Sequence, residues 1–137
     1  AQEPAPLTDA GKRVAIRTFG YFDVFVDGQP IPFRSEKAKE LLALLVDRRG
    51  GFVSSSEAIS ILWEDEPITN QTRTRYRKVA MRLKDALADH GISDIMETVR
   101  GKRRIVPENV SCDLLDYLAK KDIERYRAII AKLGIRK

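Results

Sequence analysis

The sequence predicts an α+β domain in which a small antiparallel sheet is followed by three helices and a short basic β-hairpin. Apolar and polar residues alternate over 13–33, the period of a strand. Apolar residues then recur at helical spacing between residues 36 and 90. The net charge of +5 is concentrated, because residues 69–104 carry +6 from 10 Lys/Arg and 4 acids, whereas the remainder carries −1. Such a localised basic surface is typical of a polyanionic partner, although a solvated basic face remains the alternative.

The N-terminal sheet is expected from five alternating side chains that face inward from two strands. They are Val14, Ile16, Phe22, Val24 and Val26. The dipeptide Asp27-Gly28 is a hairpin turn signal, because Gly adopts positive φ without steric cost. Pro30 and Pro32 lack the backbone N–H of a strand and restrict the next strand to an edge.

Capping residues mark the first two helices. Ser35 precedes an amphipathic segment over 36–49, which the pair Gly50-Gly51 ends. Ser54 and Glu57 have the spacing of a capping box, in which each side chain bonds the other residue's backbone N–H. A second helix is therefore expected to begin directly after Ser54.

The third helix is expected over about 69–90, opened by Thr69 or Asn70 and ended before Gly91. At 100° per residue, one stripe of its surface is apolar. The stripe consists of Tyr76, Ala80, Leu83 and Leu87. The roughly opposite side carries Thr74, Lys78, Met81 and Asp85, flanked by arginines. This helix is expected to bury one stripe and present a basic one.

After the third helix, residues 95–99 and 103–106 read as two strands joined across Arg100-Gly101-Lys102. Residues 111–133 have helical spacing again. The chain is accordingly divided into a linker remnant (1–12), one domain (13–110) and a helical extension (111–137).

Composition argues against several functional classes. One Cys and one His are too few for an intrachain disulfide or a zinc site, and a lone thiol at Cys112 fits a cytoplasmic protein. No apolar run approaches the ~20 residues of a membrane span. We find no nucleophile–base pair, metal-ligand cluster or phosphate-binding Gly loop, so we expect neither an enzyme nor a cofactor. The basic region also lacks the aromatic residues that would stack single-stranded RNA bases.

Two closely connected helices, the second rich in Arg, form a helix-turn-helix pattern. Four stretches in this order resemble the OmpR/PhoB-type winged helix of bacterial transcription factors. They are residues 33–50 (FRSEKAKELLALLVDRRG), 53–65 (VSSSEAISILWED), 76–87 (YRKVAMRLKDAL) and 98–106 (TVRGKRRIV). The first two are most similar to output domains of response regulators and SARP-like activators of Gram-positive bacteria.

The resemblance implies a winged helix-turn-helix with a four-stranded N-terminal sheet, a three-helix core, a C-terminal hairpin wing and a helical extension. It implies that the 69–90 helix enters the major groove of double-stranded DNA, with the wing (95–106) on the backbone or minor groove. It further implies homodimers on direct repeats, a receiver domain outside this chain, as in a two-component response regulator, and a 64–69 loop that corresponds to a segment able to touch RNA polymerase. The family wing often reads Gly-x-Gly-Tyr-Arg, and this chain has Arg104 where the aromatic residue would stand.

Nine residues are expected to contact DNA through phosphates or base edges. They are Arg73, Thr74, Arg75, Arg77, Lys78, Arg82, Arg100, Lys102 and Arg103. For Arg73 and Arg77, pairing with acids is an equal alternative, and Thr74 is as well suited to capping the helix. The alternative function is a protein-interaction winged helix that has lost DNA binding.

Overall fold

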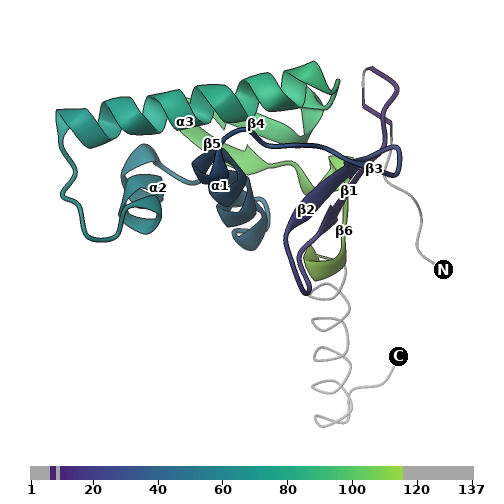
Figure 1. The fold of residues 1–137 in the computed structure, drawn as a ribbon, viewed down its shortest axis with the longest axis horizontal. Helices are drawn as coiled ribbons and strands as arrows, with labels where there is room; N and C mark the ends of the chain where they lie inside the picture. The colour runs from purple at the N-terminus through teal and green to yellow at the C-terminus, as the bar shows by residue number, and fades with distance from the viewer. Residues whose placement is uncertain (1–6, 9, 116–137) are drawn as a thin grey trace, which may run out of the picture.

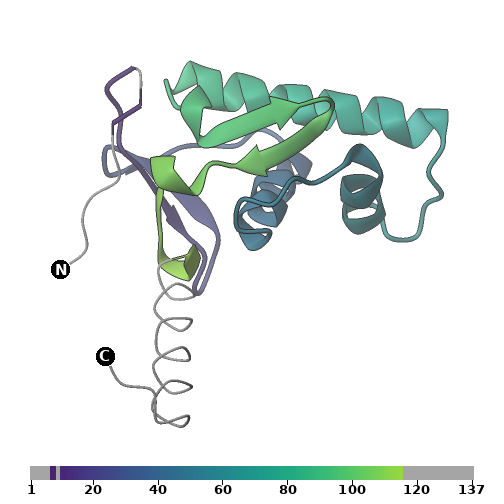
Figure 2. The same ribbon diagram turned by 180° about the vertical axis from the view of Figure 1, so that it is seen from behind.

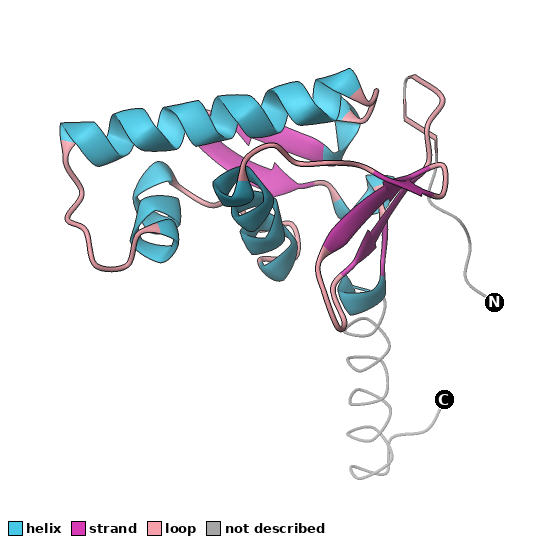
Figure 3. Ribbon diagram, viewed as in Figure 1, coloured by secondary structure: helices cyan, strands magenta, loops and turns pink. Residues whose placement is uncertain are grey.

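A computed structural model describes residues 7–8 and 10–115, and these residues form a mixed α+β fold (Figures 1 and 3). The strands are β1 (Val14–Arg17), β2 (Asp23–Val26), β3 (Gln29–Pro30), β4 (Met96–Val99), β5 (Lys102–Ile105) and β6 (Ser111–Cys112). The α-helices are α1 (Glu36–Asp47), α2 (Ser55–Leu62) and α3 (Asn70–Asp89). Two short 3-10 helices, η1 (Ser93–Ile95) and η2 (Pro107–Asn109), flank the β4–β5 pair.

The larger sheet has the strand order β3-β2-β1-β6. Asp27 and Gly28 both have positive φ, 51° and 85°, as a two-residue type I′ turn between β2 and β3 requires. The predicted turn is therefore confirmed. Val14, Ile16, Val24 and Val26 are buried as expected, and Phe22 packs half-buried against the same core.

The fourth strand of this sheet comes from the far end of the domain. Ser111 and Cys112 pair in parallel with Ala15 and Ile16 of β1. The expectation that the helical segment starts at 111 is wrong at these two residues, because pairing with β1 buries Cys112 to 1% exposure. Helical backbone begins at Asp113, and residues 116–133 of the expected extension lie outside the described residues.

The carboxylate of Asp113 holds this junction against the β1–β2 connection. It accepts hydrogen bonds from the Thr18 hydroxyl at 2.6 Å and from the backbone N–H groups of Thr18, Phe19 and Leu114. Burial by itself raises the pKa of Asp113, but these hydrogen bonds favour the ionised form and hold the pKa below its ordinary value of 3.8.

The predicted caps fix the starts of α1 and α2. The Ser35 side chain accepts from the Ala38 N–H, and Ser54 and Glu57 form the reciprocal capping box. α1 ends at Asp47 rather than residue 49, because Arg49 and Gly50 adopt positive φ, 55° and 98°, and turn the chain.

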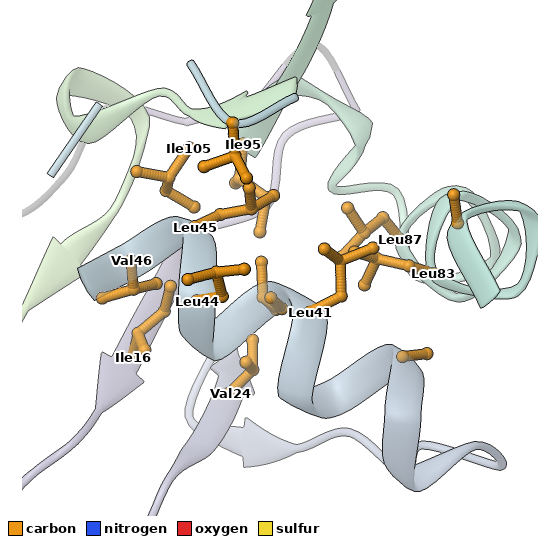
Figure 4. Packing of buried hydrophobic residues seen from close by; sticks show 14 of the residues in the cluster. Ile16, Val24, Leu41, Leu44, Leu45, Val46, Leu83, Leu87, Ile95 and Ile105 are labelled. Carbon is orange, nitrogen blue, oxygen red and sulfur yellow. The ribbon is translucent and has the colours of Figure 1, made fainter. Parts of the chain in front are cut away.

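The core is built around α1 (Figure 4). Its Leu41 and Leu45, each fully buried, lie among side chains from the sheet, from α3 and from the β4–β5 pair. Leu83 and Leu87 enter this cluster from α3, and Ile105 from β5. α1 therefore sets the position of α3 relative to the rest of the fold.

The segment before β1 also contacts α3. The Thr8 side chain is buried, and its hydroxyl donates to the Gly91 carbonyl at 2.8 Å just beyond α3. Residues 1–6 and 9 of the expected linker lie outside the described residues.

Candidate nucleic-acid interface

The basic face of α3 is exposed because the helix buries its other side. Tyr76, Ala80, Leu83 and Leu87 are each at most 2% exposed, which confirms the predicted stripe. Thr72 and Val79 extend it on the same side. The exposed cations of α3 are Arg73, Arg75, Arg77, Lys78, Arg82 and Lys84.

Hydrogen bonds at the first turn fix where α3 begins. Thr69 is the N-cap residue, and Thr69 and Thr72 each accept a hydrogen bond from the other's backbone N–H. Thr74 is exposed, but its hydroxyl donates to the Asn70 carbonyl at 2.8 Å. That donor is used within the helix, and Thr69 rather than Thr74 is the residue that caps α3.

Arg75 is held by the loop that precedes α3. Its guanidinium lies 2.6 Å from the Glu66 carboxylate and 5.5 Å from the centre of the Trp63 ring. Lys37 of α1 lies 5.8 Å from the same ring and donates to the Leu62 carbonyl at 2.7 Å. Trp63 is half-buried with two cations near its ring, and Arg75 has intramolecular partners that helical periodicity did not reveal.

The hairpin β4–β5 turns at Arg100 and Gly101, whose φ values of 52° and 78° match a type I′ turn. Arg100 and Lys102 are exposed at this turn. Figure 2 shows the hairpin lying alongside α3, on the side of the molecule that faces away from the viewer in Figure 1. The candidate interface therefore has two parts, the outer face of α3 and the hairpin turn.

Arg103, expected to face DNA, points toward α3 instead. Its Nη1 donates to the Tyr76 hydroxyl at 3.1 Å, and its backbone pairs with Val53 at 2.7 and 3.0 Å. The half-buried Arg103 thereby connects the hairpin to α3 and to the segment before α2.

Arg104 occupies the position where the family has an aromatic residue. Its Nε lies 3.0 Å from the Glu97 carboxylate on the paired strand, and its guanidinium lies 5.6 Å from the centre of the Phe52 ring. The side chain is 23% exposed, so Arg104 packs against the domain. Phe52, from the segment before α2, supplies the ring next to Arg104.

The positive charge that α3 and the hairpin present to solvent depends on which of their cations are paired with acidic side chains. Within residues 7–8 and 10–115, seven cations of α3 and the hairpin, besides Arg103, which bonds Tyr76, have no ion-pair partner. They are Arg73, Arg77, Lys78, Arg82, Lys84, Arg100 and Lys102. For Arg73 and Arg77, the alternative of pairing with acids is not observed among the described residues. Unpaired cations on an exposed helix are suited to a polyanion.

Acidic side chains gather on a different surface. A groove between α1, the end of α2 and the following loop is lined by Glu40, Asp47 and the run 64–66. No three His, Cys, Asp or Glu residues of the described part are placed to hold a metal ion. No described helix has the length and apolarity to span a membrane.

Comparison with known proteins gives two relationships. No protein-family model matches the chain. The transcriptional regulatory protein EmbR of Mycobacterium bovis and of Mycobacterium tuberculosis is 29% identical over 113 residues, which are 80% of this chain and 29% of the regulator. The small ribosomal subunit protein uS15 of Clostridium botulinum is 35% identical over 101 residues, which are 74% of this chain and 95% of the ribosomal protein.

By sequence, the chain belongs to the uS15 family. The uS15 and EmbR matches necessarily overlap over more than half of this chain. The described fold matches the solved structure of M. tuberculosis EmbR in complex with a low-affinity phosphopeptide. The TM-score is 0.68 at 28% identity, over 80% of this chain and 29% of that one. The uS15 relationship is one of sequence, whereas the described fold is shared with a transcriptional regulator.

The EmbR match supports the expectation of a transcriptional-regulator domain. This chain spans about 29% of the length of the EmbR regulators. Sequence periodicity identified the exposed cations of α3, but it missed three contacts between separate elements, those of Arg75 with Glu66, Arg103 with Tyr76 and Arg104 with Phe52. No sequence signal beyond the proximity of an acidic loop to α3 could have indicated the Glu66–Arg75 pair.

Proposed function

We propose that this chain contains a winged-helix output domain of a bacterial transcriptional regulator and binds double-stranded DNA sequence-specifically. One observation carries the proposal: α3 is fixed to the core by a buried stripe and exposes Arg73, Arg77, Lys78 and Arg82 without ion-pair partners in the described part. The likeness to EmbR, a transcriptional regulatory protein, supports it.

In this proposal α3 lies in the major groove, which admits one α-helix. Lys78 and Arg82 reach base edges or the adjacent phosphates, since Arg bonds guanine O6 and N7 in a bidentate manner. Arg100 and Lys102 at the hairpin turn contact the backbone or the neighbouring minor groove. Arg75 and Arg103 act mainly by holding the loop and the hairpin in place.

The natural protein would act in the cytoplasm, as a pair of domains on direct repeats. A receiver domain outside this chain would supply the input, as in a response regulator. RNA polymerase would meet the acidic 64–69 loop, whose residues 64–66 line the acidic groove beside α1. Glu66 lines this groove and also pairs with Arg75, so the groove adjoins the cationic face of α3.

A salt titration tests DNA binding. We expect the duplex affinity to fall linearly on a log–log scale with salt, by a slope of about −0.9 for each phosphate contacted. Arg82→Ala should weaken binding of a selected duplex at least about fivefold, since a bidentate base contact contributes about 1–3 kcal/mol. Arg13→Ala removes an exposed cation just before β1, outside α3 and the hairpin, and serves as the matched control.

Equal affinities of wild type and Arg82→Ala for the selected duplex would contradict the placement of α3. Absence of any salt-dependent duplex binding would favour the alternative of a protein-interaction winged helix.

The 35% identity to uS15 favours a second candidate, association with the small ribosomal subunit. Co-sedimentation with purified subunits in a sucrose gradient tests it. Subunit binding that excess duplex DNA does not displace would support this candidate. Sedimentation at the top of the gradient, together with specific duplex binding, would reject it.

A further inference from the structure

One residue on the cationic face of α3 has no evident structural role. Met81 is 63% exposed, the highest value among the large exposed hydrophobic side chains of the described part. It lies outside the hydrophobic core cluster and on the side of α3 opposite the buried stripe. Exposing an apolar side chain of this size to water contributes nothing to folding.

Charged residues surround Met81 on the helix surface. Arg77 and Lys78 lie one turn before it, and Lys84 and Asp85 lie one turn after it, all exposed. Three of these, Arg77, Lys78 and Lys84, are among the cations that have no ion-pair partner within the described residues. A ligand drawn to these cations would cover Met81, so binding would bury an apolar side chain that folding leaves in water.

The chemistry of a thioether limits what this side chain could recognise. Methionine has no strong donor or acceptor and cannot bond a phosphate or a polar base edge. Its unbranched, polarisable side chain adapts to small apolar surfaces. In the major groove of DNA the apolar group on a base edge is the C5-methyl of thymine.

We propose that Met81 is a specificity-determining residue that contacts a thymine methyl group and so selects a T·A pair beneath the centre of α3. The inference rests on the proposed function, because it requires α3 to lie in the major groove. It adds to that function the identity of one base pair. The cations on the same face do not supply this identity through phosphate contacts, because such contacts carry no sequence information.

Replacement of thymine by deoxyuridine tests the contact, since it removes only the methyl group. A duplex selected in vitro by the wild-type chain is resynthesised with each dT replaced in turn by dU, and affinities are measured by fluorescence anisotropy at one salt concentration. We expect one or two positions at which dU weakens wild-type binding about fourfold, as loss of one buried methyl predicts.

Substitutions of Met81 complete the test. Met81→Ala should bind the dT and dU duplexes equally, while Met81→Leu, which keeps an apolar side chain of similar size, should retain sensitivity to dU. Both variants should melt at the wild-type temperature because Met81 is exposed, and equal affinity for a nonspecific duplex would confirm that the phosphate contacts persist.

The outcomes separate the two proposals. If the wild type binds its selected duplex with the expected salt dependence but dU has no effect at any position, the assignment of Met81 is wrong and DNA binding stands. The assignment of Met81 is also overturned if Met81→Ala keeps the dU penalty, or if the selected site contains no T·A pair. If no duplex is bound in a salt-dependent manner, the proposed function fails and the assignment fails with it.

Discussion

The Arg103 guanidinium donates a hydrogen bond to the Tyr76 hydroxyl over 3.1 Å and lies 5.5 Å from the centre of the Tyr76 ring. Tyr76 belongs to the buried stripe of α3, and Arg103 belongs to β5. The contact therefore joins the two parts of the candidate interface. Because Tyr76 is only 2% exposed, water has little access to it if Arg103 is removed.

Removing this contact should loosen the hairpin without removing a phosphate contact. We expect Tyr76→Phe to lower the free energy of unfolding by about 1 kcal/mol, the contribution of one hydrogen bond, and Arg103→Ala, which leaves the buried Tyr76 hydroxyl without this partner, by about 1–3 kcal/mol. Duplex affinity should fall in both variants, with the log–log salt slope unchanged. Chemical denaturation and anisotropy titrations measure the two effects. A slope lowered by about 1 in Arg103→Ala would instead show that Arg103 contacts a phosphate.

The Glu66 carboxylate limits what Arg75 can contribute to binding. Arg75→Ala should weaken duplex binding less than Arg82→Ala, because Arg82 has no ion-pair partner among the described residues and Arg75 has one. Glu66→Gln should release Arg75, remove a negative charge next to α3 and raise duplex affinity. Stability should change little, because both side chains are more than 40% exposed and such surface pairs contribute at most about 1 kcal/mol. Stronger loss of affinity in Arg75→Ala than in Arg82→Ala would reverse the order of importance proposed for these arginines.

Gly91 combines a special backbone conformation with a close neighbour. Its φ is +70°, and an added Cβ would lie 3.0 Å from the Cβ of Ala10. We expect Gly91→Ala to lower the free energy of unfolding by more than about 1 kcal/mol, since Ala is strained at positive φ. Gly28 is the matched control, with φ +85° and no atom within 4 Å of the added Cβ. A loss in Gly91→Ala no larger than in Gly28→Ala, measured by thermal melting, would mean that the Ala10 contact relaxes without cost.

Asp113 should make stability depend on acidity. Burial opposes its ionisation, but hydrogen bonds from Thr18, Phe19 and Leu114 outweigh burial and lower its pKa in the folded state below 3.8. The folded chain therefore binds this proton less readily than the unfolded chain. The stabilisation is fully present above the unfolded pKa of about 3.9 and is lost as the pH falls through the lower folded pKa.

Asp113→Asn isolates this effect because it keeps the shape and removes the titration. Across that acidic window, the wild type should lose more stability than the variant, as measured by denaturation at a series of pH values. Parallel pH profiles for the two proteins would show that the Asp113 contacts do not favour its ionised form.

Local patterns predicted most elements of the described fold. The caps at Ser35 and Ser54, the turn at Asp27-Gly28 and the buried stripe of α3 depend on residues a few positions apart, and local geometry largely fixes such interactions. Strand β6 was not predicted, because two residues carry no periodicity and form a strand only through pairing with β1.

The sequence alone determined that α3 has one apolar and one cationic side, because the helical repeat of 3.6 residues converts spacing into direction. Tertiary structure decided which cations are available to a partner. Arg75 meets Glu66 across a loop, Arg103 meets Tyr76 across 27 positions, and Arg104 lies over Phe52. These contacts join separate elements whose relative placement depends on packing around α1, and no local repeat specifies that packing.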